Sequence, residues 1–159
     1  MRLLSLFTGI GGMDLGLERA GFEVVGMCEM DAFCRRVLAR WWPGAPVFED
    51  VRSVTGVSVR EACGPIDAVC GGFPCQDIST AGKGAGIDGE RSGLWREMHR
   101  VIRETEPRWV IAENVPALRA RGADRVLDDL EASGYACWPV VVGARHVGAP
   151  HRRDRVFIV

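Results

Sequence analysis

Two side chains of the 159-residue chain pair a nucleophile with a group that can carry a proton. Cys75 follows the Gly-Gly-Phe-Pro turn at residues 71–74, which closes one apolar run, and Glu113 follows the apolar run 109–112. A cysteine thiolate is a strong nucleophile, and a carboxyl group can donate or accept a proton. The carboxyl ends of parallel strands meet at the sheet edge where ligands bind, so we expect both groups to share one pocket.

Each candidate also has an ordinary explanation when it is taken alone. Most cysteines are small buried apolar groups, and this interpretation suits the five others: Cys28, Cys34, Cys63, Cys70 and Cys137. Cys75 differs because it lies among turn residues. Glu113 alone would be a surface or helix-capping acid, and Arg153 with Arg155 would be a solvated cluster. Together the four side chains form a set with nucleophilic, acidic and anion-stabilising roles.

A glycine-rich turn, Phe-Thr-Gly-Ile-Gly-Gly at residues 7–12, follows the first apolar run. Glycine lets the backbone approach a ligand closely, and the following helix N-terminus offers unpaired amides. Glu29, about twenty residues downstream, stands where an acid accepts hydrogen bonds from a ribose. The glycines lack the Gly-x-Gly-x-x-Gly spacing of a pyrophosphate binder, which favours an adenosyl-type cofactor. These residues alone leave two alternatives: the turn binds a nicotinamide dinucleotide, or it is a plain tight turn beside a surface glutamate.

The elements that must position these residues alternate along the chain. We expect four helices: 13–20, Asp31, as the cap, to about Arg40, 94–103 and 124–132. We expect seven strands: 3–7, 24–28, one near 47, 66–70, 109–112, 138–142 and 155–159. Residues 48–65 are expected to be irregular and the glycine-rich stretch 78–93 to be a mobile loop. This order predicts an α/β fold with a mainly parallel, doubly wound sheet. Residues 1–159 are expected to form one domain, cut short because its last strand reaches Val159.

Composition restricts the possible partners. With 47% hydrophobic residues, no membrane-length apolar run and no leader-type cleavage site, the chain is expected to be cytoplasmic. Its cysteines and histidines lack metal-site spacing, so neither a metal nor a disulfide framework is expected. Net charge is only -1, so any affinity for nucleic acid must be local, in the arginine cluster at Arg145, Arg152, Arg153 and Arg155.

Four segments in order resemble the successive signatures of DNA (cytosine-5) methyltransferases. They are LFTGIGG at 6–12, GGFPCQDIS at 71–79, ENVP at 113–116 and HRRDRVF at 151–157. The resemblance spans nearly the whole chain, and its Pro-Cys-Gln segment is the most specific part. It implies a Rossmann-like methyltransferase fold and S-adenosylmethionine as the cofactor.

The resemblance also implies a mechanism on a cytosine flipped out of double-stranded DNA. Cys75 adds to carbon 6, carbon 5 then takes the methyl group of S-adenosylmethionine, and the carbon 5 proton and the thiol leave. Glu113 would donate to ring nitrogen 3 and accept from the exocyclic amine, a role that needs a raised carboxyl pKa. Arg153 would stabilise the base and Arg155 would brace the site.

The same resemblance assigns binding residues. In the cofactor site Glu29 would hold the ribose, Met30 would lie against adenine and Asp50 would read the adenine amine; the whole set is Phe7, Gly9, Ile10, Gly12, Glu29, Met30, Asp50, Val51, Gly72, Pro74 and Leu94. A loop closing over the flipped base would include Gln76, Ser79, Lys83 and Arg91. Ser5, Met30 and His151 depart from the residues usual in the family, which puts fine positioning in doubt.

Family members continue past the last strand into a target-recognition region that this sequence lacks. The chain is therefore expected to be a catalytic part whose remainder lies on a second polypeptide or was removed. An alternative is an inactive remnant that binds S-adenosylmethionine or DNA without turnover. A nicotinamide-dependent oxidoreductase, supported only by the first glycine turn and Glu29, is the third hypothesis.

Overall fold

The computed structural model describes residues 1–74 and 94–159, which form two compact units. Unit 1 comprises residues 1–72 and 100–110, and unit 2 comprises the described residues of 73–99 and 111–159. The expected loop at 78–93 lies outside the described residues. That residues 1–159 form a single incomplete domain stays a prediction.

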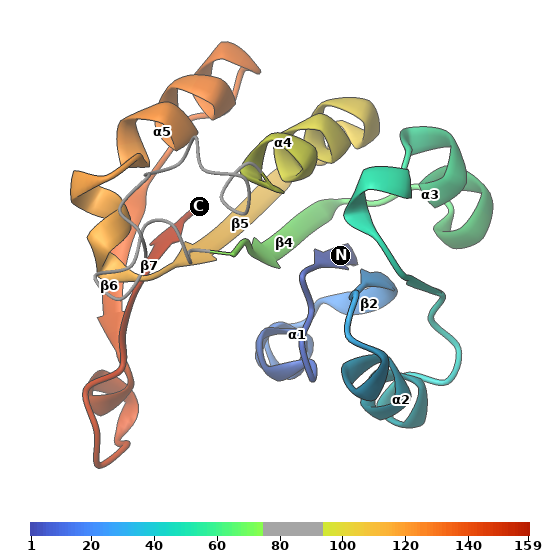
Figure 1. The fold of residues 1–159 in the computed structure, drawn as a ribbon, viewed down its shortest axis with the longest axis horizontal. Coiled ribbons are helices and arrows are strands. Elements are labelled where there is room, and N and C mark those ends of the chain that lie inside the picture. Colours follow the sequence, from blue (N-terminus) through green and yellow to red (C-terminus); the bar gives the residue numbers. More distant parts are fainter. Residues whose placement is uncertain (75–93) are drawn as a thin grey trace. The chain divides into compact units, whose positions relative to one another are not determined.

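Unit 1 contains four parallel strands in the order β3-β2-β1-β4 (Figure 1). They are β1 (Arg2–Leu6), β2 (Glu23–Cys28), β3 (Val47–Phe48) and β4 (Ala68–Gly72). Fully buried leucines of β1 and Met27 of β2 form much of the core of this unit. All four expected strands are confirmed, and β4 begins two residues later than expected.

The helices of unit 1 follow the expected capping signals. They are α1 (Gly12–Arg19) and α2 (Ala32–Trp41), and Asp31 caps α2 by accepting a 2.9 Å hydrogen bond from the Cys34 amide. Both helices are confirmed. The expectation of irregular structure up to Gly64 is wrong, because the 3-10 turn η1 (Val51–Ser53) and the helix α3 (Gly56–Cys63) fill this segment.

Helix α3 begins with a capping box made by two short side chains. The Thr55 hydroxyl accepts from the Ser58 amide at 3.1 Å, and the Ser58 hydroxyl accepts from the Thr55 amide at 2.9 Å. Serine stands here where a capping box usually has glutamate or glutamine. The glycine and β-branched valines that follow are weak helix formers, which hides the helix in the sequence.

Unit 2 contains three strands in the order β5-β7-β6. The strands are β5 (Trp109–Asn114), β6 (Pro139–Gly143) and β7 (Asp154–Ile158); α5 (Ala123–Ala132) and the 3-10 turns η3 (Pro116–Ala120) and η4 (Ala144–Val147) complete the unit. Strand β7 is antiparallel to both neighbours. The connection 144–153 between β6 and β7 is too short for the crossover that a parallel pair requires.

Two elements belong to both units. Helix α4 (Leu94–Thr105) has its first half in unit 2 and its second half in unit 1, and the division also falls within β5. Three parallel and two antiparallel strand pairs confirm an α/β fold with mostly parallel strands. Among the described residues, no helix has the length and apolar character needed to cross a membrane.

Candidate active site

The first glycine turn has a backbone that few residue types can adopt. Phe7, Gly9 and Gly11 have φ values of 55°, 59° and 86°, in the left-handed region. A Cβ atom on Gly11 would lie 2.5 Å from the Trp42 ring, so only glycine fits there without displacing the indole. The Thr8 hydroxyl closes the turn by donating to the Ser5 carbonyl at 3.1 Å. The sequence pattern therefore corresponds to a fixed turn between β1 and α1.

Glu29 meets this turn from the end of β2. Its Oε2 accepts a 2.7 Å hydrogen bond from the Gly9 amide, and its Oε1 accepts one of 2.8 Å from the Asp31 amide. A carboxylate has about four acceptor positions, so both oxygens keep capacity for ribose hydroxyls. Because Glu29 already engages the Gly9 amide, that amide is not available to a pyrophosphate. The geometry fits a nucleoside better than a dinucleotide.

The third contribution to this edge of unit 1 comes from the segment after β3. Asp50 caps η1 and pairs with Arg52, whose NH2 lies 2.8 Å from Oδ2. These hydrogen bonds from Arg52 lower the pKa of Asp50, so the carboxylate stays ionised and can accept from an amine. Val51 beside it is buried. Since β1, β2 and β3 are parallel neighbours, Gly9, Glu29 and Asp50 all lie beyond the carboxyl ends of their strands.

Apolar side chains stand exposed on the same segments. Ile10 is 60% exposed, Met30 is 68% exposed and Phe33 is 61% exposed. Exposed apolar groups beside acidic side chains suit a ligand with a flat aromatic base and polar substituents. Phe33 was not expected from the sequence, although an aromatic residue in the first turn of α2 is a usable signal. Three further residues of unit 1 were expected in the cofactor site. Phe7 and Gly72 are half-buried, and Gly12 is exposed.

A buried polar pair lies below the turn. Asp14 and Ser5 are both 0% exposed, and within the described residues none of their side-chain oxygens has a hydrogen bond of ordinary geometry. Burial raises the pKa of Asp14, an effect that the nearby Ser5 hydroxyl partly offsets. Ser5 was named from the sequence, whereas Asp14 was not; an acid on the inward face of α1 is the signal that indicates it.

The five cysteines other than Cys75 differ in how deeply they are buried. Burial raises the pKa of Cys28 and of Cys70 to about 12, which makes both thiols poor nucleophiles. Cys63 is also buried. The expectation of burial is wrong for Cys34 and Cys137, which are partly exposed: Cys34 lies in the first turn of α2, and Cys137 lies in the connection between α5 and β6.

In unit 2 the structure brings Glu113 and Arg155 together. Glu113 lies within β5, opposite Phe157 of β7, and its Oε1 accepts a 2.8 Å hydrogen bond from Arg155 Nε. Burial raises the pKa of Glu113, although the charges of Arg155 and Arg153 oppose the shift. Arg153 itself is exposed and has a φ of 38°, a strained value for a side chain of this size. The carboxyl is thus oriented by one arginine and kept prone to protonation by its surroundings.

Asn114, next to Glu113, is a residue that the sequence analysis did not single out. It is 2% exposed, and its Nδ2 donates to the Phe73 carbonyl at 3.1 Å while its Oδ1 accepts from the Val115 amide at 2.8 Å. The Phe73 ring packs on buried Trp95, with 5.2 Å between ring centroids. The segment that leads to Pro74 is therefore held at its backbone and at its ring. An amide at the end of an apolar strand is the signal.

The remaining expected site residues lie outside the described residues: Cys75, Gln76, Ser79, Lys83 and Arg91. The half-buried Pro74 and Leu94 flank them on either side. A pocket shared by Cys75 and Glu113 therefore stays a prediction.

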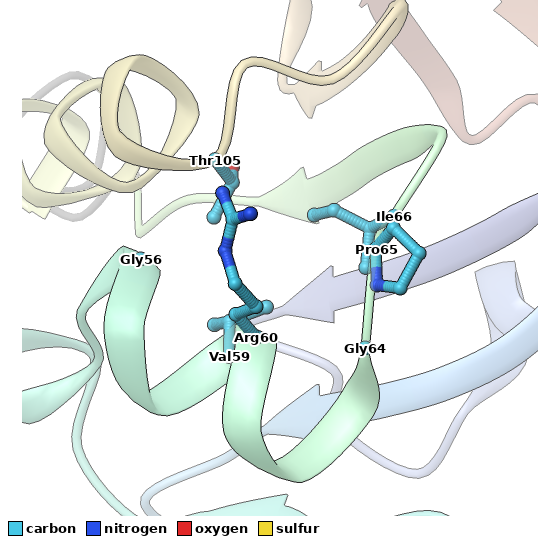
Figure 2. A pocket seen from close by; sticks show the side chains of 7 residues that line it. All are labelled: Gly56, Val59, Arg60, Gly64, Pro65, Ile66 and Thr105. Atoms are coloured by element: carbon cyan, nitrogen blue, oxygen red, sulfur yellow. The ribbon is translucent and has the colours of Figure 1, made fainter.

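A small cavity of about 90 Å³ lies at the other edge of unit 1 (Figure 2). It is lined by Gly56, Val59, Arg60, Gly64, Pro65, Ile66 and Thr105. Residues 64–66 precede β4, so the cavity lies at the amino ends of the strands, and no expected site residue lines it.

Comparison with known proteins decides the family. A family model described as C-5 cytosine-specific DNA methylase matches residues 1–159. The chain belongs to this family. One relative of this methylase chain is the type II methyltransferase M2.BsuMI of Bacillus subtilis, which is 36% identical over 167 residues. The match covers all of this chain and 41% of the relative. The type II methyltransferase M.AquIA of a Picosynechococcus strain is 38% identical, with coverage of 99% of this chain and 71% of the relative.

Solved structures show the same fold. A prophage-encoded DNA modification methyltransferase of E. coli, so described in its structure, superposes with a TM-score of 0.82 and 29% identity; the match covers 99% of the methylase chain and 45% of that protein. The S. pombe Dnmt2 methyltransferase gives a TM-score of 0.78 at 20% identity, covering 99% and 50% of the two chains. The chain thus spans between 41% and 71% of the length of these four proteins.

Proposed function

We propose that this chain is the catalytic part of a DNA (cytosine-5-)-methyltransferase, which methylates carbon 5 of cytosine through a covalent Cys75 adduct. The observation that carries the proposal is the ion pair of half-buried Glu113 with Arg155, which joins the Glu-Asn-Val-Pro and His-Arg-Arg-Asp-Arg-Val-Phe segments; burial also raises the pKa of Glu113. The family match over residues 1–159 supports the same reading.

The methyl donor of this proposal is S-adenosylmethionine, which supplies an electrophilic methyl group when bound. Glu29 would hold the ribose with the acceptor capacity left on its two oxygens. The ionised Asp50 would accept from the adenine amine, and exposed Met30 and Ile10 would cover apolar parts of the ligand. Two carboxylates on one edge favour a ligand with a cationic sulfonium and ammonium over an anionic dinucleotide.

Glu113 would carry the proton that the base needs. Addition of the Cys75 thiolate at carbon 6 places negative charge on the cytosine ring, and protonation at nitrogen 3 relieves it. Because the pKa of Glu113 is raised by burial, its carboxyl holds the proton to a higher pH than an ordinary glutamate does. Arg155 fixes Oε1, which leaves Oε2 to face the base, and Arg153 would add positive charge beside it.

DNA would meet a local concentration of positive charge in unit 2. Residues 132–153 include no aspartate or glutamate, although the whole chain has a net charge of -1. Five basic side chains are exposed there: Arg145, His146, His151, Arg152 and Arg153. Phosphate contacts by such groups position a protein on DNA without reading its sequence. Sequence readout would then need a recognition region on a second polypeptide, and we place this assembly in the cytoplasm.

The test is methyl transfer from radiolabelled S-adenosylmethionine to DNA, by the chain alone and with a recognition part supplied from a relative. We expect label at cytosine carbon 5 with the reconstituted protein and none after Cys75→Ser. No transfer by the reconstituted protein, with S-adenosylmethionine binding retained, would leave the inactive remnant as the better reading. Binding of a nicotinamide cofactor in place of S-adenosylmethionine would instead support the oxidoreductase hypothesis.

A further inference from the structure

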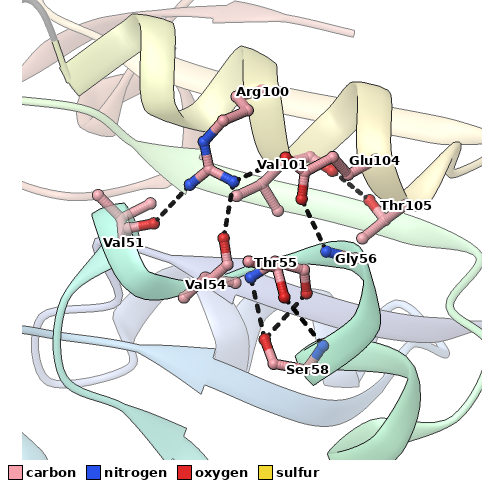
Figure 3. A network of polar contacts seen from close by, with 9 residues as sticks. All are labelled: Val51, Val54, Thr55, Gly56, Ser58, Arg100, Val101, Glu104 and Thr105. Atoms are coloured by element: carbon pink, nitrogen blue, oxygen red, sulfur yellow. Dashed lines mark hydrogen bonds and ion pairs between the residues drawn. The ribbon is translucent and has the colours of Figure 1, made fainter.

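Arg100, in the second half of α4, binds the segment that follows Asp50 (Figure 3). Its NH1 donates to the Val54 carbonyl at 2.8 Å, and its NH2 donates to the Val51 carbonyl at 3.0 Å. Val51 and Val54 are 4% and 0% exposed, so both bonds are made to nearly buried backbone. One guanidinium therefore fixes both ends of the η1 turn.

Glu104, one helical turn further along α4, adds to this arrangement. Its Oε1 accepts from Arg100 NH1 at 2.9 Å, and its Oε2 accepts from the Gly56 amide at 2.8 Å. A Cβ atom on Gly56 would lie 2.5 Å from the Glu104 carbonyl oxygen, so α3 begins directly against the backbone of α4. The carboxylate thus orients the guanidinium and also holds the next segment.

The segment that Arg100 binds follows Asp50 directly, because Asp50 is the N-cap of η1. The turn η1 is three residues long and is too short to hold its own position, since its internal hydrogen bonds are few and weak. Asp50 is its N-cap, so the direction of the Asp50 carboxylate depends on where the carbonyls of Val51 and Val54 are held.

We propose that Arg100 is a positioning residue of the cofactor site, which sets Asp50 and Val51 in the geometry that selects adenine. The inference rests on the proposed function, because it takes S-adenosylmethionine as the ligand of this edge. Arg100 touches no ligand in this scheme. Its planar fork reaches two carbonyls at once, which a single ammonium group cannot do in the same geometry.

The test uses calorimetry of the whole chain with two ligands, S-adenosylhomocysteine and S-inosylhomocysteine. The inosyl ligand has a carbonyl oxygen in place of the adenine amine, which an ionised Asp50 repels. We expect the unchanged chain to prefer the adenosyl ligand by at least about tenfold. Arg100→Met, which keeps the apolar stem and removes the donors, should weaken adenosyl binding by about tenfold and inosyl binding much less.

Two further variants separate positioning from loss of stability. Thr55→Ala removes the capping box of α3 in the same unit and leaves the Arg100 bonds in place, so it should lower stability yet keep the preference for adenosyl. Arg100→Lys should restore part of the preference. An Arg100→Met chain that keeps the full preference would overturn the inference alone, whereas an unchanged chain that binds neither ligand would overturn the proposed cofactor as well.

Discussion

The two units hold their chemical groups by different means. In unit 1 the backbone holds the chemical groups in place. The glycine turn has left-handed φ values, and the Glu29 carboxylate accepts a hydrogen bond from the Gly9 amide of that turn. In unit 2, side chains hold one another, as Glu113 with Arg155 and Asn114 with the Phe73 carbonyl. In unit 1 the pKa of Asp50, at the surface, is lowered by hydrogen bonds from Arg52, whereas in unit 2 burial raises the pKa of the half-buried Glu113. Binding and proton transfer need these opposite environments.

The largest expected effect is on proton transfer in unit 2. Glu113→Gln keeps the shape and the contact with Arg155 but removes the proton donor, so methyl transfer by the reconstituted protein should fall by about 10² to 10⁴. Because the pKa of Glu113 is raised, activity of the unchanged protein should decline as pH rises through that pKa, and the variant should lose this limb of the profile. Affinity for S-adenosylhomocysteine should stay unchanged; a large loss would contradict the division of roles between the units.

The next effect tests the backbone of unit 1. Gly11→Ala combines a positive φ with a Cβ atom 2.5 Å from the Trp42 ring, and should lower the free energy of unfolding by about 2 to 4 kcal/mol. Gly16→Ala is the matched control in α1, where a Cβ atom meets nothing within 4 Å and alanine favours the helix. Urea denaturation measures both. Equal stability of the two variants would mean that the turn is not held as rigidly as its geometry indicates.

A smaller effect is expected at Asp14, the buried acid of unit 1. Burial raises its pKa in the folded protein, so the stability it contributes is present below the ordinary pKa and is lost as pH rises through the raised one. Asp14→Asn does not titrate and should gain about 1 to 3 kcal/mol over the unchanged chain at pH 8, with much less gain near pH 3.5. Denaturation at the two pH values measures the difference, and a gain independent of pH would contradict the argument.

The smallest effect concerns the basic surface of unit 2. Arg152→Ala and Arg145→Ala should each weaken binding to any DNA duplex and lower the slope of log affinity against log salt by about 0.9. Arg40→Ala, an exposed change on α2 of unit 1, should leave the slope unaltered. Fluorescence titration of a labelled duplex at several salt concentrations measures this. Unchanged slopes for both unit 2 variants would move the DNA contact elsewhere.

Local signals in the sequence predicted the strands and four of the five α-helices that the structure describes, because glycine turns, an Asp31 cap and apolar runs act over a few residues. They also predicted that Glu29 would lie near the glycine turn, since parallel β1 and β2 end at one edge. Helix α3 was missed because its cap uses serine, and the direction of β7 was missed because it depends on connection length.

Contacts between distant segments could not be predicted in this way. The bonds from Asn114 to Phe73 and from Arg100 to Val51 join residues 41 and 49 positions apart, and no periodicity encodes such a pairing. The burial of Asp14 likewise depends on how α1 packs. Residues that orient others are therefore found only in three dimensions, whereas residues that stand in a signature can be named beforehand.

The indole of Trp42 gives the glycine turn an optical probe of its own. Its ring lies against Gly11 and its Nε1 donates to Glu18 at 2.8 Å, whereas Trp41, Trp109 and Trp138 are exposed and should respond little to events at the turn. A ligand that tightens the turn would change the emission of Trp42, and Trp95→Phe would remove the background from the buried tryptophan of unit 2. Ligand occupancy of unit 1 could then be followed in unlabelled protein, in real time and without DNA.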